Sequence, residues 1–397
     1  MTDDALPSRG QSRHVGAPAR LERLLLTDFR SFASADLRFS DEMVVFVGPN
    51  GGGKTNLLEA ISLLMPGRGL LGARLSDMTR RGTNKPHGGW AVSAEIAGVA
   101  GPIRLGTGLT KDAAGRDRRA FRLEGETASP KDIGELVRLV WLTPAMERLF
   151  EESASARRRF FDRLVATFDS AHPARLGRYE RALSERQRLL NEGTGEPAWL
   201  SGLERIIAGE GVAIAAARLQ LLECLRAEIA RDGPWADEDL FPRADLALED
   251  GLEALLCGQP ALLAEAEFER ALAAGRMRDA EAGRALEGAH RSDLKVRHKA
   301  KAMPAEECST GEQKALLLNI VLSAVRLISD AKGSAPLVLL DEIAAHLDEV
   351  RRDALFAALE SVGAQVFLTG TELSAFGALG SRAQAFEINH SRAQLRQ

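Results

Sequence analysis

Residues 48–55 have the composition and order of a phosphate-binding loop. They follow an apolar stretch, 43–47, that is typical of a buried strand, and they precede a helical stretch over 56–65. Glycines let consecutive backbone N–H groups approach a phosphate without a Cβ clash, and the helix N-terminus adds partial positive charge. The residues that we expect to surround the phosphates are Gly48, Pro49, Asn50, Gly51, Gly52, Gly53, Lys54 and Thr55. Lys54 is expected on the β- and γ-phosphates, and Thr55 on Mg²⁺.

A second candidate group lies almost 290 residues later, where a very apolar strand over 337–340 ends in two carboxylates. Asp341 is expected to hold the Mg²⁺ shell together with Thr55, and Glu342 to polarise the attacking water as the catalytic residue. The residues directly after them include His346 and Asp348, which we assign to the same nucleotide site.

A third group, residues 309–313, precedes a long helical stretch over about 311–329. Ser309 and Gly311 at a helix N-terminus would form an anion-binding corner, and we include Gln313 in it. The alternative is a helix cap in which Glu312 completes the capping box. In order and spacing, the three groups resemble an ATP-binding-cassette head, in which the serine of one subunit completes the site of the other.

Composition indicates an ordinary globular protein. The 397 residues carry 52 basic and 56 acidic side chains, a net charge of −4, so any contact with nucleic acid has to come from local basic patches. Cys224, Cys257 and Cys308 are too scattered for a disulfide framework or a zinc cluster and suit a reducing cytoplasm. The polar residues 1–20 lack the apolar stretch of a secretory signal, and we expect a disordered tail there and no membrane segment.

The pattern of elements predicts an α/β head of the P-loop, ABC type that is split between the two ends of the chain. We expect its N-terminal part over 21–143, an inserted and mainly helical arm over 144–290, and its C-terminal part over 291–397. Strands are expected over 21–26, 37–47, 90–96, 103–109, 116–123, 337–340 and 365–369, and a helix from about 349. In the arm, Arg186 interrupts the apolar stripe of Leu176, Tyr179, Leu183 and Leu190. Even a helix over 199–230 would be only roughly 48 Å long, so we expect a compact arm.

With these residues in place, the chain resembles the RecF family of bacterial recombination and repair ATPases from residue 21 onward. Residues 24–32 look like the family's opening strand and turn, which adds Arg30 and Ser31 to the nucleotide site by resemblance. Residues 141–144 and 157–162 resemble the entry into its arm, and residues 288–294 resemble its Gly-Pro-His-Arg-Asp-Asp-Leu return segment. The resemblance implies ATP and Mg²⁺ as cofactors, an ATP-dependent homodimer, and the mediators RecR and RecO as partners.

Three positions depart from the pattern of such heads. Thr310 and Glu312 stand where the general signature has two glycines, and no glutamine lies between Gln11 and Gln187 to sense the γ-phosphate. The switch histidine expected after the last strand is replaced by residues 369–371, Thr-Gly-Thr. We therefore expect a weak, DNA-stimulated ATPase with slow turnover.

Four stretches rich in arginine and lysine are candidates for DNA contact, although such a stretch is usually only a solvated face. They cover residues 68–85, 116–122, 157–159 and 291–301. The residues that we assign to DNA are Arg68, Arg74, Arg80, Arg81, Lys85, Arg116, Arg118 and Arg119. Aromatic residues make up only 5% of the chain, so phosphate contact with duplex or gapped DNA fits better than base stacking on a single strand.

The sequence thus predicts a cytoplasmic ATPase that closes a homodimer on double-stranded, gapped or single-stranded DNA. It would support recombinase loading, replication restart and the SOS response to DNA damage. One alternative is an ATP-binding module of another SMC-like or ABC-type assembly with little hydrolysis. A transporter motor would lack the 290–293 segment, and a long-armed chromosome-maintenance or nuclease-partner ATPase would need hundreds of heptad residues that are absent.

Overall fold

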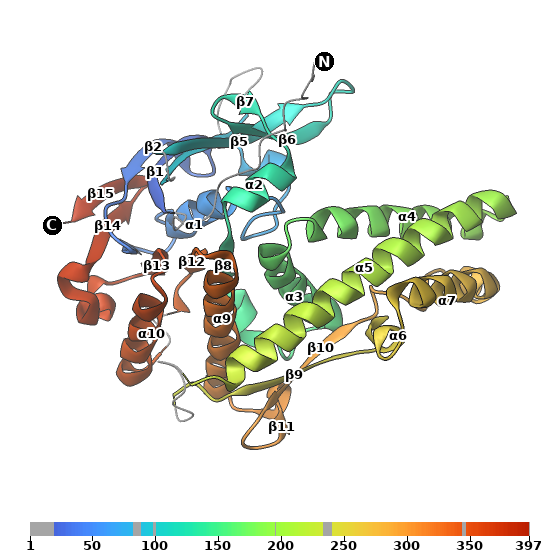
Figure 1. Ribbon diagram of the computed structural model, residues 1–397. Coiled ribbons are helices and arrows are strands. Elements are labelled where there is room, and N and C mark those ends of the chain that lie inside the picture. Colours follow the sequence, from blue (N-terminus) through green and yellow to red (C-terminus); the bar gives the residue numbers. More distant parts are fainter. Residues whose placement is uncertain are drawn as a thin grey trace, which may run out of the picture.

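The computed structural model describes residues 20–81, 89–97, 101–194, 196–232, 240–343 and 347–396. Nearly all of the expected N-terminal tail, together with Lys85 and His346, therefore lies outside the described residues. The chain forms two six-stranded sheets on one side of the molecule and an elongated helical arm on the other (Figure 1).

A mainly parallel sheet is built from both ends of the chain, in the order β15-β14-β3-β13-β12-β8. All neighbours are parallel except the β14–β15 hairpin. The strands are β3 (Met43–Val47), β8 (Leu139–Leu142), β12 (Leu337–Leu340), β13 (Val366–Gly370), β14 (Ala383–Asn389) and β15 (Arg392–Arg396). Because β3 lies between β13 and β14, the N-terminal and C-terminal parts form one sheet, as expected for a split head.

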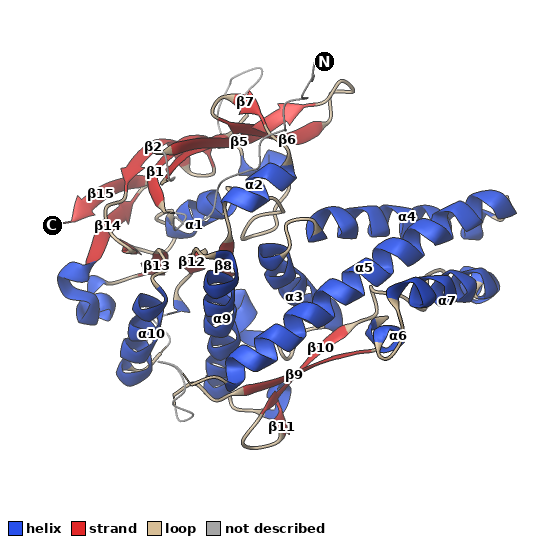
Figure 2. Cartoon of the chain, in the orientation of Figure 1, coloured by secondary structure: helices blue, strands red, loops and turns tan. Residues whose placement is uncertain are grey.

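A second, antiparallel sheet has the strand order β2-β1-β4-β5-β6-β7. It lies on the side of the phosphate-loop helix α1 that is opposite to the parallel sheet (Figure 2). Its strands are β1 (Leu21–Phe29), β2 (Phe32–Arg38), β4 (Ala91–Ile96), β5 (Ile103–Lys111), β6 (Asp117–Leu123) and β7 (Glu126–Thr127). The head also contains the helices α1 (Lys54–Ser62), α2 (Pro130–Leu136), α9 (Thr310–Lys332) and α10 (Glu349–Val362). Short 3₁₀ turns are η1 (Leu75–Met78), η2 (Pro144–Arg148), η3 (Ala305–Glu307) and η5 (Leu373–Arg382).

The arm is a bundle around the 34-residue helix α5 (Pro197–Ala230). Its other helices are α3 (Ala154–Phe168), α4 (His172–Glu192), α6 (Glu253–Leu256), α7 (Ala261–Ala274) and α8 (Arg276–Ala282). A small antiparallel sheet joins β9 (Ala244–Glu249), β10 (Asp293–His298) and β11 (Met303–Pro304) at its base. Ile207 and Ile214 of α5 belong to the core of the arm, whereas Leu221 and Leu225 of the same helix belong to the core of the head.

Two fully buried arginines hold the arm together. Arg186 of α4 donates from Nε to Glu204 (3.0 Å), from Nη1 to Asp279 (2.7 Å) and from Nη2 to the Leu272 carbonyl (2.7 Å). Arg218 of α5 makes a two-pronged contact with Asp162 of α3 (2.8 and 2.9 Å). Each guanidinium thus links helices that are distant in the sequence.

Most predicted elements are confirmed, with one correction. The single strand expected over 37–47 is wrong, because β2 ends at Arg38 and β3 begins at Met43. These strands pair in different sheets, and the polar residues Ser40, Asp41 and Glu42 cross between them. The strands β7, β8, β9, β10, β11, β14 and β15 were not predicted. No described helix has the length and apolar composition needed to cross a membrane.

Replacing Arg186 by methionine should lower the free energy of unfolding by about 3–5 kcal/mol, because Glu204 and Asp279 would keep buried charges without this partner. Urea denaturation followed by circular dichroism measures this change. Arg188→Met is the matched control on the same helix, because the ion pairs of Arg188 with Glu185 and Glu192 are exposed to solvent and screened, so their loss should change the stability little. Equal stability of the two variants would contradict a structural role for Arg186.

Candidate functional site

The phosphate loop runs from the end of β3 into the start of α1, with its backbone in conformations that favour glycine. Gly51 and Gly53 have φ values of 77° and 115°. A Cβ on Gly48, whose φ is 150°, would come within 2.1 Å of the Ile388 carbonyl oxygen of β14. The neighbouring strand therefore requires glycine at this position, besides the needs of any ligand.

Lys54 is buried at the centre of the loop, with 4% of its side chain exposed. Its Nζ donates hydrogen bonds to the carbonyl oxygens of Gly48 (2.8 Å) and Pro49 (3.1 Å) and lies 4.0 Å from the Glu342 carboxylate. This cation is thus held against the backbone of the phosphate loop at the N-terminus of α1, where an anionic group would find positive charge.

The carboxylate of Asp341 connects the loop helix to the end of β12. Thr55 Oγ1 lies 3.1 Å from both of its oxygens, and Thr369 Oγ1 donates to Oδ1 at 2.8 Å. Burial raises the pKa of Asp341 above its ordinary value, and the two threonine hydroxyls only partly oppose this shift. Adjacent hydroxyl and carboxylate oxygens are the hard ligands that Mg²⁺ prefers, so the pair fits this ion.

Glu342 follows directly and is partly exposed, with 32% of its side chain accessible. Its φ of 55° places it in the left-handed region, which is uncommon for a residue with a Cβ. Its backbone N–H donates to Thr369 Oγ1 at 2.8 Å. Thr369 therefore contacts both carboxylate residues, although sequence reasoning treated this position only as a missing histidine.

Arg30 and Ser31 lie in the turn between β1 and β2, beside α1. Arg30 makes a two-pronged ion pair with the fully buried Glu59 of α1 (2.6 and 2.7 Å). Ser31 Oγ accepts a hydrogen bond from Asn56 Nδ2 at 2.8 Å. The structure thus brings this predicted pair next to the phosphate loop, with the Arg30 guanidinium held against the helix.

Residues 309–313 form the N-terminus of α9. Ser309 is the exposed N-cap, and it forms a complete capping box with Glu312, whose carboxylate is also paired with Lys301. These contacts lower the pKa of Glu312 to about 2. The capping box that the sequence offered as an alternative is therefore present. The N-terminus of the helix lies at the surface, and Gly311 is exposed.

Two predicted members of the site have other surroundings. Gln313 is only 3% exposed and donates to Glu151 Oε1 (3.2 Å) and to the Cys308 carbonyl (3.1 Å), so its amide faces the interior. Within the protomer, these contacts join the start of α9 to Glu151, and the role of Gln313 at a nucleotide stays a prediction. Asp348 caps α10 by accepting from the Arg351 N–H at 2.8 Å.

The predicted DNA contacts fall into three groups. Arg119 points inward, where its guanidinium donates to Thr107 and to the carbonyls of Leu63, Met65 and Gly67, and burial lowers its pKa to about 9. Arg80 and Arg116 contact Asp28 and Asp112, respectively. The remaining described members are exposed, namely Arg68, Arg74, Arg81 and Arg118.

Comparison with known proteins places this geometry in a family. Residues 20–386 match the family model described as the RecF/RecN/SMC N terminal domain. The chain is 49% identical to the DNA replication and repair protein RecF of Mesorhizobium japonicum, over 94% of this chain and 97% of the relative. It is 48% identical to the protein of the same name from Agrobacterium fabrum, over 93% and 97%.

Solved structures support the same fold. The recombination mediator protein RecF-ATP in the RecFOR pathway superposes with a TM-score of 0.81 at 21% identity, covering 98% of this chain and 100% of that one. An SMC head bound to the C-winged helix domain of ScpA gives 0.53 at 15% identity, over 95% and 97%. The predicted fold class and the predicted resemblance are confirmed. The chain belongs to the RecF family of DNA replication and repair proteins.

Proposed function

We propose that this chain binds ATP with Mg²⁺ at the loop formed by residues 48–55 and hydrolyses it slowly. The observation that carries the proposal is the contact between Thr55 and Asp341, which joins the phosphate loop to a buried carboxylate from the opposite end of the chain. Membership of a family with an ATP-bound solved structure supports it.

Each residue of the site has a chemical role in this proposal. Lys54 would exchange the Gly48 and Pro49 carbonyls for the β- and γ-phosphates, and Thr55 and Asp341 would hold Mg²⁺, which supplies charge neutralisation on the phosphates. Glu342 would accept hydrogen bonds from the attacking water and orient it. Thr369 would fix Asp341 and Glu342 relative to each other, because its hydroxyl contacts both residues.

The proposed active form is a homodimer in which Ser309 and Gly311 of one protomer complete the nucleotide site of the other. In the described part of the chain, the hydrogen bonds and ion pairs of residues 309–313 go to neighbours such as Glu151, Lys301 and Cys308 and not to the phosphate loop. The exposed N-terminus of α9 would then be free to meet the anionic nucleotide of a partner.

DNA is the proposed macromolecular ligand, as duplex or as duplex beside a gap. Support comes from the exposed Arg68, Arg74, Arg81 and Arg118 and from relatives named as DNA replication and repair proteins. The solved relative is assigned to the RecFOR pathway, and we propose RecR and RecO as partners in recombinase loading and in the SOS response within the cytoplasm. A binding module that hardly hydrolyses ATP is the second candidate, favoured by Thr369 at the place of the switch histidine.

The Glu342→Gln variant separates the two candidates. If Glu342 orients the water, ATP turnover should fall by about 10²- to 10⁴-fold while ATP affinity is retained. Steady-state phosphate release and calorimetry measure the two quantities. Glu372→Gln is the control, because Glu372 is exposed and outside the site. Equal turnover of Glu342→Gln and the unmodified chain would contradict the catalytic role.

The Ser309→Arg variant tests the shared site. It should bind ATP normally but remain monomeric in light scattering with a non-hydrolysable ATP analogue, because the larger side chain would occupy the surface that meets the partner. Ser129→Arg is the matched control, because Ser129 is also an exposed capping-box serine, at the start of α2, and its loss costs a similar stability of about 1 kcal/mol. ATP-dependent dimers of Ser309→Arg would contradict the shared site.

DNA binding should depend on both ATP and salt. Affinity for duplex and gapped DNA should rise with ATP and fall steeply between two salt concentrations, since phosphate contacts release counterions. Fluorescence anisotropy with duplex, gapped and single-stranded substrates measures this, and Lys54→Ala is expected to lose the ATP-dependent part because the loop loses its cation. DNA affinity that does not respond to ATP in the unmodified chain would contradict the proposal.

A further inference from the structure

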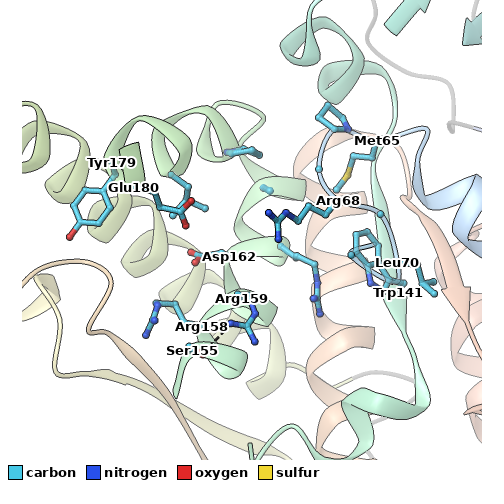
Figure 3. Close-up of a pocket in the computed structure, with 18 of the residues that line it drawn as sticks. Met65, Arg68, Leu70, Trp141, Ser155, Arg158, Arg159, Asp162, Tyr179 and Glu180 are labelled. Atoms are coloured by element: carbon cyan, nitrogen blue, oxygen red, sulfur yellow. Dashed lines mark hydrogen bonds between the residues drawn. The ribbon is translucent and has the colours of Figure 1, made fainter. Parts of the chain in front are cut away.

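A cavity of about 600 Å³ lies where the head meets the arm, and its lining contains none of the phosphate-loop residues. Its head side is formed by residues 65–72, directly after α1, and by Trp141 of β8. Its arm side is formed by α3 and by the start of α4. Figure 3 shows Arg68 reaching from the head side toward Asp162 and Glu180, with Arg158 and Arg159 below it. The volume is in the range of small-molecule sites, about 300–1,000 Å³.

Four guanidinium groups line this cavity without a carboxylate partner among the described residues: Arg68, Arg158, Arg159 and Arg163. Arg158 donates to the Ser292 carbonyl (2.7 Å), and Arg159 to Ser155 Oγ (3.1 Å). Arg163 lies over the Trp141 ring, 5.3 Å from its centroid. These neutral contacts orient the side chains, and Asp162 and Asp293 attract Arg158 without forming an ion pair with it.

The acidic and titratable residues of the lining do not balance this charge. Both oxygens of Asp162 are occupied by Arg218 (2.8 and 2.9 Å), and His172 contacts Oδ1 at 2.9 Å. Glu180 is exposed on α4. Burial lowers the pKa of His290, which favours its neutral form. Among the described residues, Glu180 is therefore the one carboxylate of the lining that makes no ion pair, against the four arginines.

Holding like charges together in a partly closed space is unfavourable unless an anion enters it. Burial lowers the pKa of Arg158, and burial together with Arg159 lowers the pKa of Arg163 to about 10. Guanidinium groups present several donors in a plane, which matches the oxygens of a phosphate better than a single charge does. Apolar walls such as Leu70 and Leu176 would cover a sugar or base.

We propose that this cavity is a second phosphate site, in which Arg68, Arg158, Arg159 and Arg163 bind a phosphate ester. The source is either the terminal phosphate of a nucleic-acid strand or the phosphates of a free nucleotide, which share the same chemistry. Because Arg68 lies in the segment after α1 and the other three lie on α3, the bound anion would bridge these two segments.

The site is also connected to the phosphate loop through α1. Leu70 N donates to Ser62 Oγ at 2.7 Å, and Arg119 holds the carbonyls of Leu63, Met65 and Gly67. The cavity segment is thereby fixed to the C-terminal end of the helix whose N-terminal end carries Lys54. The two phosphate sites occupy opposite ends of one helix.

The test uses the full chain carrying Lys54→Ala, so that the phosphate loop has lost its cation. Calorimetry with sodium tripolyphosphate should show one site per chain. Adding Arg68→Gln and Arg159→Gln should weaken this binding by about tenfold or more, since charge-assisted hydrogen bonds to the phosphate would be lost. Both side chains are exposed and make few contacts, and Arg68→Gln alone should give part of the loss. The control pair is Arg270→Gln and Arg284→Gln, which are exposed and outside this cavity.

The source of the phosphate is identified by comparing the affinities of two tetrathymidylates, one with a 5′-phosphate and one with a 5′-hydroxyl. Tighter binding of the phosphorylated strand, lost in the Arg68/Arg159 variant, supports a strand end. Binding of tripolyphosphate alone, lost in the same variant, supports a free nucleotide. No binding, an equal loss in the control pair, or tighter binding of a tetra-aspartate peptide would each overturn the proposal. Because all chains in the comparison share Lys54→Ala, the result does not depend on whether ATP hydrolysis occurs.

Discussion

The contact between the Thr55 hydroxyl and the Asp341 carboxylate is the constraint on which the candidate site depends. It can form only because β3 and β12 are strands of the same parallel sheet, separated by β13. Carboxyl ends of parallel strands meet at one edge, so this sheet order brings residues 286 positions apart into hydrogen-bonding distance. Thr369, at the end of β13, stands between the two and contacts both carboxylate residues.

Much of this arrangement could be predicted from the sequence because each part carries a local signal. The phosphate loop has glycines where the backbone requires positive φ or close approach, and β12 is a continuous apolar run with its carboxylates directly after it. These features depend on residues that are neighbours in the chain. The family resemblance then indicated that these separate motifs belong to one nucleotide site, which a single motif cannot indicate.

The parts that were missed either lack a local sequence signal or depend on contacts between distant residues. The β14–β15 hairpin turns at His390 and Ser391, both with positive φ, where asparagine and glycine would have been a recognisable signal. The interruption of the apolar stripe by Arg186 gave no indication of the buried acids on α5 and α8 that neutralise it. Gln313 and Arg119 likewise turn inward toward carbonyl oxygens that only the folded chain supplies.

The long helix α5 belongs to two cores at once, since its first half packs within the arm and its second half packs against α9 in the head. A straight helix of 34 residues is roughly 50 Å long at about 1.5 Å per residue. Both halves of α5 are fixed by packing, so this helix connects the arm rigidly to α9 in the head. The ion pairs of Glu228 with Arg326 and of Arg231 with Asp330 join the second half of α5 to the C-terminal part of α9. A rotation of α5 by a few degrees about these contacts would displace the far tip of the arm by several ångströms.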